Sequence, residues 1–366
     1  MVGHDQTNYN TVCIQRSTYE TIDLNFLLKP LGGFNNYINK GERVLLKVNL
    51  LNASAPEKRV VTDPSLVKKT AELVLKAGGI PYIGDSPSGR FTKRRLNKVY
   101  EKAGLLELSR DLSIELNYDT NTTKVPIPNG KLLKKTPLCN FILQADKIIA
   151  LPKLKTHSYM IMTLATKIMY GAVPGLNKSK YHSLFTRRSS FSDMLLDILS
   201  VAKPDLIIMD GIIGMQGNGP ASGKPVNLGV LLAAENTIAM DIAICEMLSI
   251  EPVGIPVLKR AKLRRLWPNK ITYPQLTPND VKYTGFILPI TAGYLLTGKK
   301  TPQQSPKVTS ECISCGLCEE ICPKNAITNK PEGAQIDYAK CIRCYCCHEI
   351  CPEEAIELEV LAKIIQ

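Results

Sequence analysis

Two copies of one cysteine motif lie near the C-terminal end of the chain. Each copy reads Cys-x2-Cys-x2-Cys-x3-Cys-Pro, and the second begins at Cys341, 29 positions after Cys312. Nine of the twelve cysteines fall between Cys312 and Cys351. In a reducing compartment, so dense a group of thiols indicates metal ligation, because disulfide frameworks form under oxidising conditions.

The distribution of apolar residues favours a location in a reducing compartment. No apolar run approaches the roughly 20 residues that a membrane-spanning helix needs. The first 14 residues start polar and lack the basic-then-apolar pattern of a secretory signal. We therefore expect a soluble cytoplasmic protein that does not insert into a membrane.

The cysteine spacing is typical of bacterial-type ferredoxins, which hold two [4Fe–4S] clusters. Three thiolates of each run bind one cluster, and the fourth, before proline, binds the other. Structural zinc is disfavoured because its sites use paired CxxC knuckles with four ligands each. The expected ligand sets are Cys312, Cys315, Cys318 and Cys351 for one cluster, and Cys341, Cys344, Cys347 and Cys322 for the other. Such clusters move single electrons, so this region predicts electron transfer.

The four remaining cysteines do not fit the repeat. Cys346 lies beside the expected ligand Cys347 and is interpreted as a spare thiol. Cys13, Cys139 and Cys245 lie in apolar surroundings, which is typical of small core residues.

The first 300 residues alternate strand-like and helix-like patterns. A helix that begins after Asp63-Pro64 and ends at Gly78-Gly79 separates buried strands at 43–50 and 80–84. Further strands are expected at 147–151, 205–210 and 227–233, and helices at 161–170, 191–202 and 237–248. This alternation predicts an α/β fold with a mainly parallel sheet flanked by helices over 1–300. A linker at 301–308 and a small α+β ferredoxin-like domain at 309–366 complete the expected organisation.

The formal net charge of +13 is divided unevenly. Residues 311–359 carry a net charge of −6, so the rest of the chain carries +19. A basic chain first suggests nucleic acid, but no nucleic-acid motif is present and only 6% of residues are aromatic, which makes that partner unlikely. A basic body beside an acidic cluster region instead favours domain docking or attraction of an anionic substrate.

Three polar segments follow strands of the body, where α/β folds place ligands. In an extended segment, Lys153, Lys155 and His157 point to one face, although a solvated strand edge would also explain two lysines there. The other segments contain Lys167 with His182, and Asp210 with the glycine-rich 217–220. Neither a Rossmann fingerprint nor a P-loop is present, so nucleotide binding has no motif behind it.

Together these segments resemble the domain-of-unknown-function 362 family, an iron–sulfur-associated family. The matching residues are the strand end at 47–50, Thr62-Asp63-Pro64, Gly84-Asp85-Ser86-Pro87, 152–157, Lys167 with 171–175, His182, Pro204-Asp205-Leu206, Asp210-Gly211, 217–220 and Ala239-Met240-Asp241. The resemblance covers nearly the whole chain, although Gln216 stands where the family is expected to favour Glu. A remote likeness to lactate-racemase-type proteins rests on Lys167, Pro174-Gly175 and His182.

The resemblance implies a cationic cleft shared by these segments. Lys153, Lys155 and Lys167 would hold an anion, and His157 or His182 would transfer a proton. Asp85 and Asp210 would orient the ligand or a histidine. Asn218 and the amides of Gly217 and Gly219 would bind a carboxylate or phosphate.

The sequence therefore predicts an iron–sulfur redox protein. If the protein has catalysis of its own, we expect a ferredoxin-type oxidoreductase. It would pass electrons through two clusters to an anionic substrate, or to a flavin or deazaflavin bound in the cleft. The alternative is a ferredoxin-like carrier subunit that docks on a partner oxidoreductase without catalysis. The partners are an electron donor or acceptor protein and an anionic small molecule, with a homodimer as an open alternative.

Overall fold

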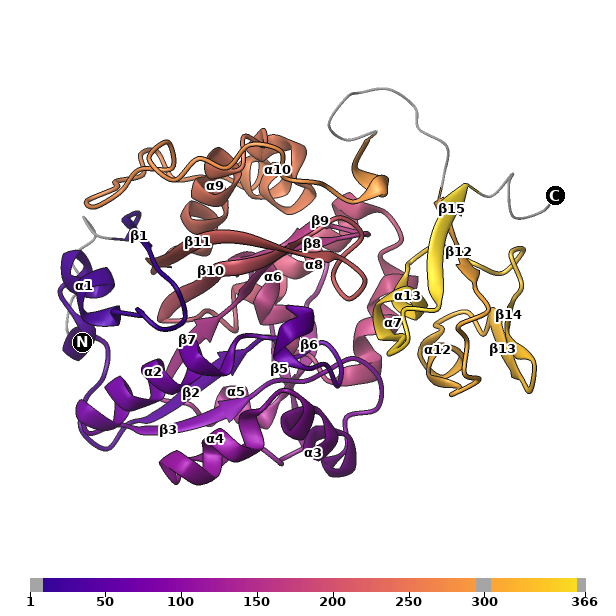
Figure 1. Ribbon diagram of the computed structural model, residues 1–366, viewed down its shortest axis with the longest axis horizontal. Coiled ribbons are helices and arrows are strands. Elements are labelled where there is room, and N and C mark those ends of the chain that lie inside the picture. Colours follow the sequence, from indigo (N-terminus) through magenta and orange to yellow (C-terminus); the bar gives the residue numbers. More distant parts are fainter. Residues whose placement is uncertain (1–8, 294–303, 361–366) are drawn as a thin grey trace.

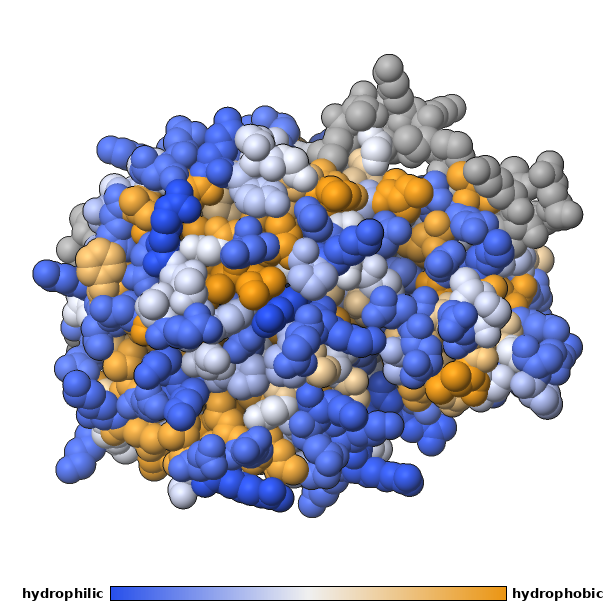
Figure 2. Space-filling view, viewed as in Figure 1, coloured by the Kyte–Doolittle hydropathy of each residue, from blue (hydrophilic) through white to orange (hydrophobic). Residues whose placement is uncertain are grey.

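The computed structural model describes residues 9–293 and 304–360. A large α/β body lies beside a smaller cysteine-rich domain, which is yellow and on the right in Figure 1. Hydrophilic side chains predominate on the face shown in Figure 2, with apolar patches between them. Within the described residues, no helix has the length and apolar character that crossing a bilayer requires.

The body is built on a mixed sheet in the order β1-β11-β10-β7-β2-β3-β4, with β8 paired to β10 and β9 paired to β8. Its strands are β1 Val12–Arg16, β2 Arg43–Val48, β3 Ile80–Gly84, β4 Glu115–Leu116, β7 Lys147–Leu151, β8 Lys153–His157, β9 Ile161–Thr163, β10 Leu206–Gln216 and β11 Lys224–Ala234. From β10 to β4 all pairs are parallel, whereas β1, β11 and β9 pair antiparallel. The carboxyl ends of β7, β2 and β3 therefore meet at one edge.

Both faces of this sheet are buried, which explains the continuous apolar runs in its strands. In β2, Leu45 joins one apolar core while Val44, Leu46 and Val48 join the other. This alternation is the period-two pattern of a strand.

Helices cover both faces (Figure 1). They are α1 Leu24–Leu28, α2 Pro64–Lys76, α3 Lys93–Lys102, α4 Leu105–Leu112, α5 Asn140–Leu143, α6 Ala165–Ile168, α7 Gly175–Leu184, α8 Arg188–Leu199, α9 Thr237–Met247 and α10 Pro256–Leu263. Helices α2, α3 and α4 pack into the core of Leu46, whereas α6, α8, α9 and α10 pack into that of Leu45. A two-stranded ribbon of β5 Thr122–Pro126 and β6 Lys135–Cys139 lies apart from the main sheet. The predicted fold class is confirmed.

The cysteine-rich domain combines two short helices with two strand pairs. Strand β12 (Gln304–Val308) pairs with β15 (Ile356–Val360), and β13 (Ile327–Lys330) pairs with β14 (Gly333–Ile336). Each cysteine run leads into a five-residue helix, α12 (Leu317–Ile321) or α13 (Cys346–Ile350). The sequence repeat is thus also a structural repeat.

Two predicted segments differ from the structure. Residues 161–170 form β9 and α6 instead of one helix, because Asp241 accepts hydrogen bonds from the amides of Ala165 and Thr166 at 2.8 and 3.1 Å and starts the helix there. Residues 304–308 of the predicted linker form β12, whose ladder with β15 makes them part of the cluster domain. Residues 301–303 lie outside the described residues.

The cluster domain docks on the body through contacts between opposite charges. Lys58 contacts Glu354 and Arg90 contacts Glu320, each at 3.2 Å. These pairs join a basic body to an acidic domain. They are half-exposed, so they orient the domains more than they stabilise them.

Removing the Asp241 carboxylate tests how α6 is positioned. We expect Asp241→Ala to lower the free energy of unfolding by about 2–4 kcal/mol, because two buried amides lose their acceptor. Urea unfolding measures the change, and the exposed Glu251 in Glu251→Ala provides the control. Equal stabilities of the two variants would contradict this role.

Candidate functional site

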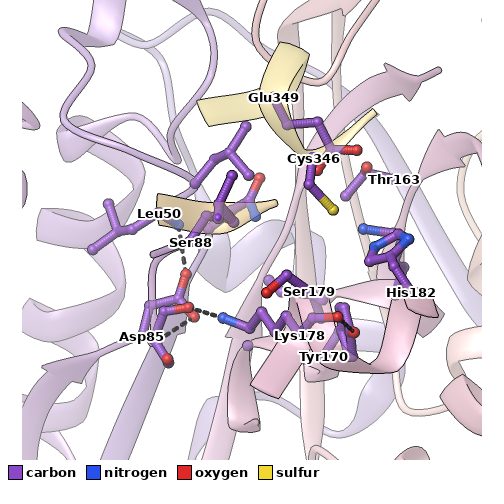
Figure 3. Close-up of a pocket in the computed structure, with 17 residues that line it drawn as sticks. Leu50, Asp85, Ser88, Thr163, Tyr170, Lys178, Ser179, His182, Cys346 and Glu349 are labelled. Atoms are coloured by element: carbon purple, nitrogen blue, oxygen red, sulfur yellow. Dashed lines mark hydrogen bonds between the residues drawn. The ribbon is translucent and has the colours of Figure 1, made fainter. Parts of the chain in front are cut away.

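A cavity lies where the carboxyl ends of β2 and β3 meet α13 of the cluster domain (Figure 3). It encloses about 610 Å³ of space, part of it open to solvent. The lining side chains discussed below are Asp85, Ser86, Thr163, Lys167, Lys178, His182, Cys346 and Glu349. In Figure 3 the Cys346 sulfur points into the cavity from α13, on the side facing Lys178 and His182.

Lys167 is the unpaired cation of this cavity. Among the described residues, no acceptor lies within hydrogen-bonding or ion-pair distance of its ammonium, which is 5.7 Å from the centre of the Tyr170 ring. Burial lowers the pKa of Lys167, and the Glu349 carboxyl counteracts this. Burial in turn raises the pKa of Glu349 to about 7, although nearby Lys167 lowers it. The site therefore combines a lysine and a carboxyl whose charged forms burial disfavours and whose mutual attraction favours them.

Lys178 adds a second ammonium from α7. It donates to the carbonyl of Ser86, and burial lowers its pKa to about 8. The Ser86 hydroxyl accepts from the amide of Gly175 at 2.9 Å, so the β3 loop positions the start of α7. No role is predicted from the sequence for this lysine, which lies between the predicted site residues Lys167 and His182.

His182 faces the cavity as a neutral base. Burial and the charge of Lys167 lower its pKa to about 3, and its ring packs 4.3 Å from that of Phe191, centre to centre. Among the described residues, its Nδ1 has no hydrogen-bond partner, and neither has Thr163 Oγ1. Buried polar atoms without partners are costly, so their gathering at a cavity indicates a ligand or water.

Lys153 and Asp210 lie elsewhere. Their side chains are fully buried and paired at 2.8 Å, and the Tyr19 hydroxyl contacts both, at 2.7 and 3.0 Å. Asp210 also accepts from the amide of Asp63, the residue that caps α2. This network joins β8, β10 and α2. Neither the predicted anion-binding role of Lys153 nor the solvated strand edge matches its position.

Lys155 and His157 lie behind the cavity wall. Lys155 donates to the carbonyl of Val60 at 2.6 Å, and burial with nearby Lys167 lowers its pKa to about 7. His157 Nδ1 accepts from two backbone amides, which leaves its Nε2 proton toward Glu349, 3.4 Å away. Burial and neighbouring cations hold the pKa of His157 well below its usual range. Its neutral ring thus contacts the cluster domain.

Asp85 lines the cavity, but its carboxylate is already engaged. It pairs with buried Lys47 at 2.8 Å and accepts from the amides of Leu50 and Ser86. A Cβ on Gly171 would lie 2.2 Å from the Asp85 oxygen, which explains a glycine there. Asp85 therefore organises the loop that carries Ser86.

The glycine loop does not contribute to the cavity. The Gly217 amide donates to Ile287, and the Gly219 amide donates to Gly217 and to Thr156. The Asn218 side chain accepts from Ile290, while its carbonyl contacts His348 Nε2 at 3.1 Å. These amides are therefore occupied by protein acceptors instead of being free for the predicted anion, and the loop contacts the cluster domain.

Two further cavities lie within the cluster domain. One is lined by Cys312, Cys315, Cys318 and Cys351, and the other by Cys322, Cys341, Cys344 and Cys347 together with Cys346. Four thiols around one space form the donor set that a [4Fe–4S] cluster requires. Cys346 also lines the cavity of Lys167, so it separates the second cysteine cavity from the candidate site.

Glu349 and Cys346 show what the sequence concealed. Both lie inside the second cysteine run, where the motif spacing identifies the four expected cluster ligands and gives no reason to select the residues between them. Only the docking of α13 turns them toward Lys167.

The Lys47–Asp85 pair provides a test of the loop assignment. We expect Asp85→Ala to lower the free energy of unfolding by about 3–5 kcal/mol, because it leaves a buried ammonium without its counter-charge. Denaturant unfolding measures the loss, and Asp111→Ala, at an exposed position on α4, is the control. A loss of ligand binding without a loss of stability would assign Asp85 to the ligand instead.

Family models match most of the chain. Residues 44–246 match the domain of unknown function DUF362, and residues 306–328 and 334–357 match the 4Fe–4S binding domain. A thylakoid-associated protein of Synechocystis sp. is 34% identical over 275 residues, which cover 73% of this chain and 82% of the relative. Nothing in these comparisons supports the expected flavin or deazaflavin.

Two solved structures show a distant likeness. The lactate racemase apoprotein of Thermoanaerobacterium thermosaccharolyticum has a TM-score of 0.39 at 15% identity, covering 57% of this chain and 49% of that one. A protein of Thermotoga maritima has a TM-score of 0.33 at 11% identity, covering 54% and 51%. The chain thus spans about half the length of each.

The 4Fe–4S match covers both cysteine runs and implies electron transfer. Both the family model over the body and the 34% identical relative lead to one conclusion. The chain belongs to the DUF362 family and has a ferredoxin-type 4Fe–4S domain on its C-terminal side.

Proposed function

We propose that this protein transfers electrons between two [4Fe–4S] clusters and a small anionic substrate held between the body and the cluster domain. One observation carries the proposal. Cys346 lines both the second cysteine cavity and the cavity in which the Lys167 ammonium lacks a partner. A cluster in the first of these spaces and a substrate in the second would be separated by little more than one residue.

The ligands of the two clusters follow from the cysteine cavities. Cys312, Cys315, Cys318 and Cys351 would hold one cluster, and Cys341, Cys344, Cys347 and Cys322 the other. When bound, the clusters supply single electrons, one each, which together match a two-electron reduction.

The body supplies binding groups for an anion. Isolated burial of an ammonium costs several kcal/mol even after relaxation, so an anion beside Lys167 would offset a cost that the protein otherwise bears. Lys178 contributes a second positive charge. The atoms without partners, His182 Nδ1 and Thr163 Oγ1, would hydrogen-bond the substrate and orient it.

The cluster domain completes the site. Because α13 covers the cavity with Cys346 and Glu349, docking restricts water around the lysines and strengthens their interaction with an anion. His157 Nε2 lies 3.4 Å from Glu349 Oε1 on the body side, and among the described residues neither of these two atoms has a hydrogen-bond partner.

Iron content tests the crossed arrangement of the ligands. Anaerobically reconstituted protein should hold about eight irons per chain, as two cubanes require. We expect Cys312→Ser/Cys351→Ser to lose one cluster and keep about four irons, and Cys341→Ser/Cys351→Ser to lose both. Cys346→Ser serves as the control and should retain the wild-type content. Crossed ligation would be contradicted if Cys312→Ser/Cys351→Ser lost both clusters while Cys341→Ser/Cys351→Ser kept about four irons.

Reoxidation of the reduced clusters tests the proposed function. Reduced protein is mixed anaerobically with small carboxylates and phosphate esters that bear a carbonyl or a conjugated double bond, and cluster absorbance is followed. For any acceptor that reoxidises the clusters, Lys167→Met should raise the half-saturating concentration by about 10–100-fold, the loss expected for a charged hydrogen bond.

The matched control is Lys180→Met, at an exposed position on the same helix as Lys178. It should leave the half-saturating concentration unchanged. If both variants behave like the wild type, the protein is a carrier that acts only through a partner enzyme, and the proposed substrate site is wrong.

A further inference from the structure

A larger cavity lies beside the first cysteine run, which begins at Cys312. It encloses about 1170 Å³, part of it open to solvent, between α3, the 52–58 segment and the residues around Cys315. Of the eight cysteines in the two motifs, Cys315 is the one that is exposed, whereas the others are buried or half-buried. Electron tunnelling weakens steeply with distance, so the cluster on Cys315 would be the one that a second protein can reach.

The wall of this groove is positively charged. Arg95, Lys98 and Lys102 recur at helical spacing and line it from one face of α3. Lys98 and Lys102 are exposed, and neither forms an ion pair within the described part of the chain. Glu353 is the acidic residue in the lining, and Lys58 is paired with Glu354. The α3 wall of the groove is therefore positively charged, although the cluster domain itself carries a net negative charge.

An apolar patch accompanies the charges. Ile313, two residues before Cys315, is 62% exposed, and Leu317 lines the same groove. Weak electron-transfer complexes bury small interfaces, below about 1,200 Å² in total. A small apolar contact surrounded by steering charges suits such a transient complex.

We propose that an electron-carrier protein with an acidic surface docks in this groove and exchanges electrons through the cluster of Cys315. One electron passes per encounter: the carrier is oxidised by one electron and the cluster is reduced by one, with no bond or proton transferred. The inference rests on the proposed function only in taking Cys315 as a cluster ligand. The second cluster, next to Cys346, would then face the substrate, so electrons enter and leave on different sides of the domain.

Stopped-flow reduction of the cluster-loaded full chain tests the docking surface. The donor is a reduced acidic [2Fe–2S] ferredoxin, and the readout is the loss of cluster absorbance without any substrate. At low ionic strength, Lys98→Glu/Lys102→Glu should slow the second-order reduction by about 10-fold or more, because electrostatic steering commonly contributes 10–1,000-fold. Added salt should slow the wild type and reduce its difference from the variant.

Two controls separate docking from net charge and from cluster damage. Lys259→Glu/Lys270→Glu changes the net charge equally at exposed positions outside the groove and should stay close to the wild-type rate. Reduced methyl viologen, a small cation that needs no docking surface, should reduce the Lys98→Glu/Lys102→Glu protein at least as fast as the wild type. Iron content confirms that the clusters are intact.

Equal rates for the two double variants, or wild-type reduction that does not depend on salt, would overturn the proposal. So would an effect that salt does not weaken, since the substitutions would then slow reduction by something other than electrostatic steering. The Lys167→Met variant should be reduced normally here. The reoxidation test of the substrate site and the reduction test of the docking groove can therefore fail independently of each other.

Discussion

The burial of lysines in the α/β body is the constraint on which the rest of this structure depends. Five of the buried or half-buried lysines in the body are Lys47, Lys153, Lys155, Lys167 and Lys178. Two are paired with aspartates and two donate to backbone carbonyls. Only Lys167 has neither kind of partner among the described residues, so the desolvation cost is concentrated at one ammonium. That ammonium and Cys346 line the same cavity, which the cluster domain closes.

The position of the cluster domain accounts for the uneven distribution of charge between the two parts of the chain. An acidic domain docks on a basic body, with half-exposed ion pairs at the rim and buried contacts from His157 and His348 nearer the centre. Docking leaves one cysteine run against the cavity of Lys167 and the other beside an open groove with a positively charged wall. Two clusters at these places would connect a carrier outside to a substrate inside.

The local patterns in the sequence predicted much of the fold. The strands at 80–84 and 147–151 and the start of the helix after Asp63 agree with the structure, because apolar periodicity and a capping residue act locally. The helix expected at 161–170 was wrong, because its boundary depends on Asp241, a residue some 75 positions away whose carboxylate accepts from the α6 amides. Residues 304–308 were predicted as a linker but form a strand, because their pairing partner lies far along the chain, at 356–360.

By itself, the sequence determined the donor set for the 4Fe–4S domain, the α/β class and the family, because spacing, periodicity and motif content are properties of the linear chain. Only the tertiary structure decided which lysines face a cavity. Lys153 and Lys155 were predicted as equals of Lys167, yet one pairs with Asp210, one bonds a carbonyl, and the third faces an open space. The physical reason is that a buried charge is defined by its partners, which come from strands and helices distant in sequence. The same holds for Cys346, a spare thiol in the sequence that docking places between two cavities.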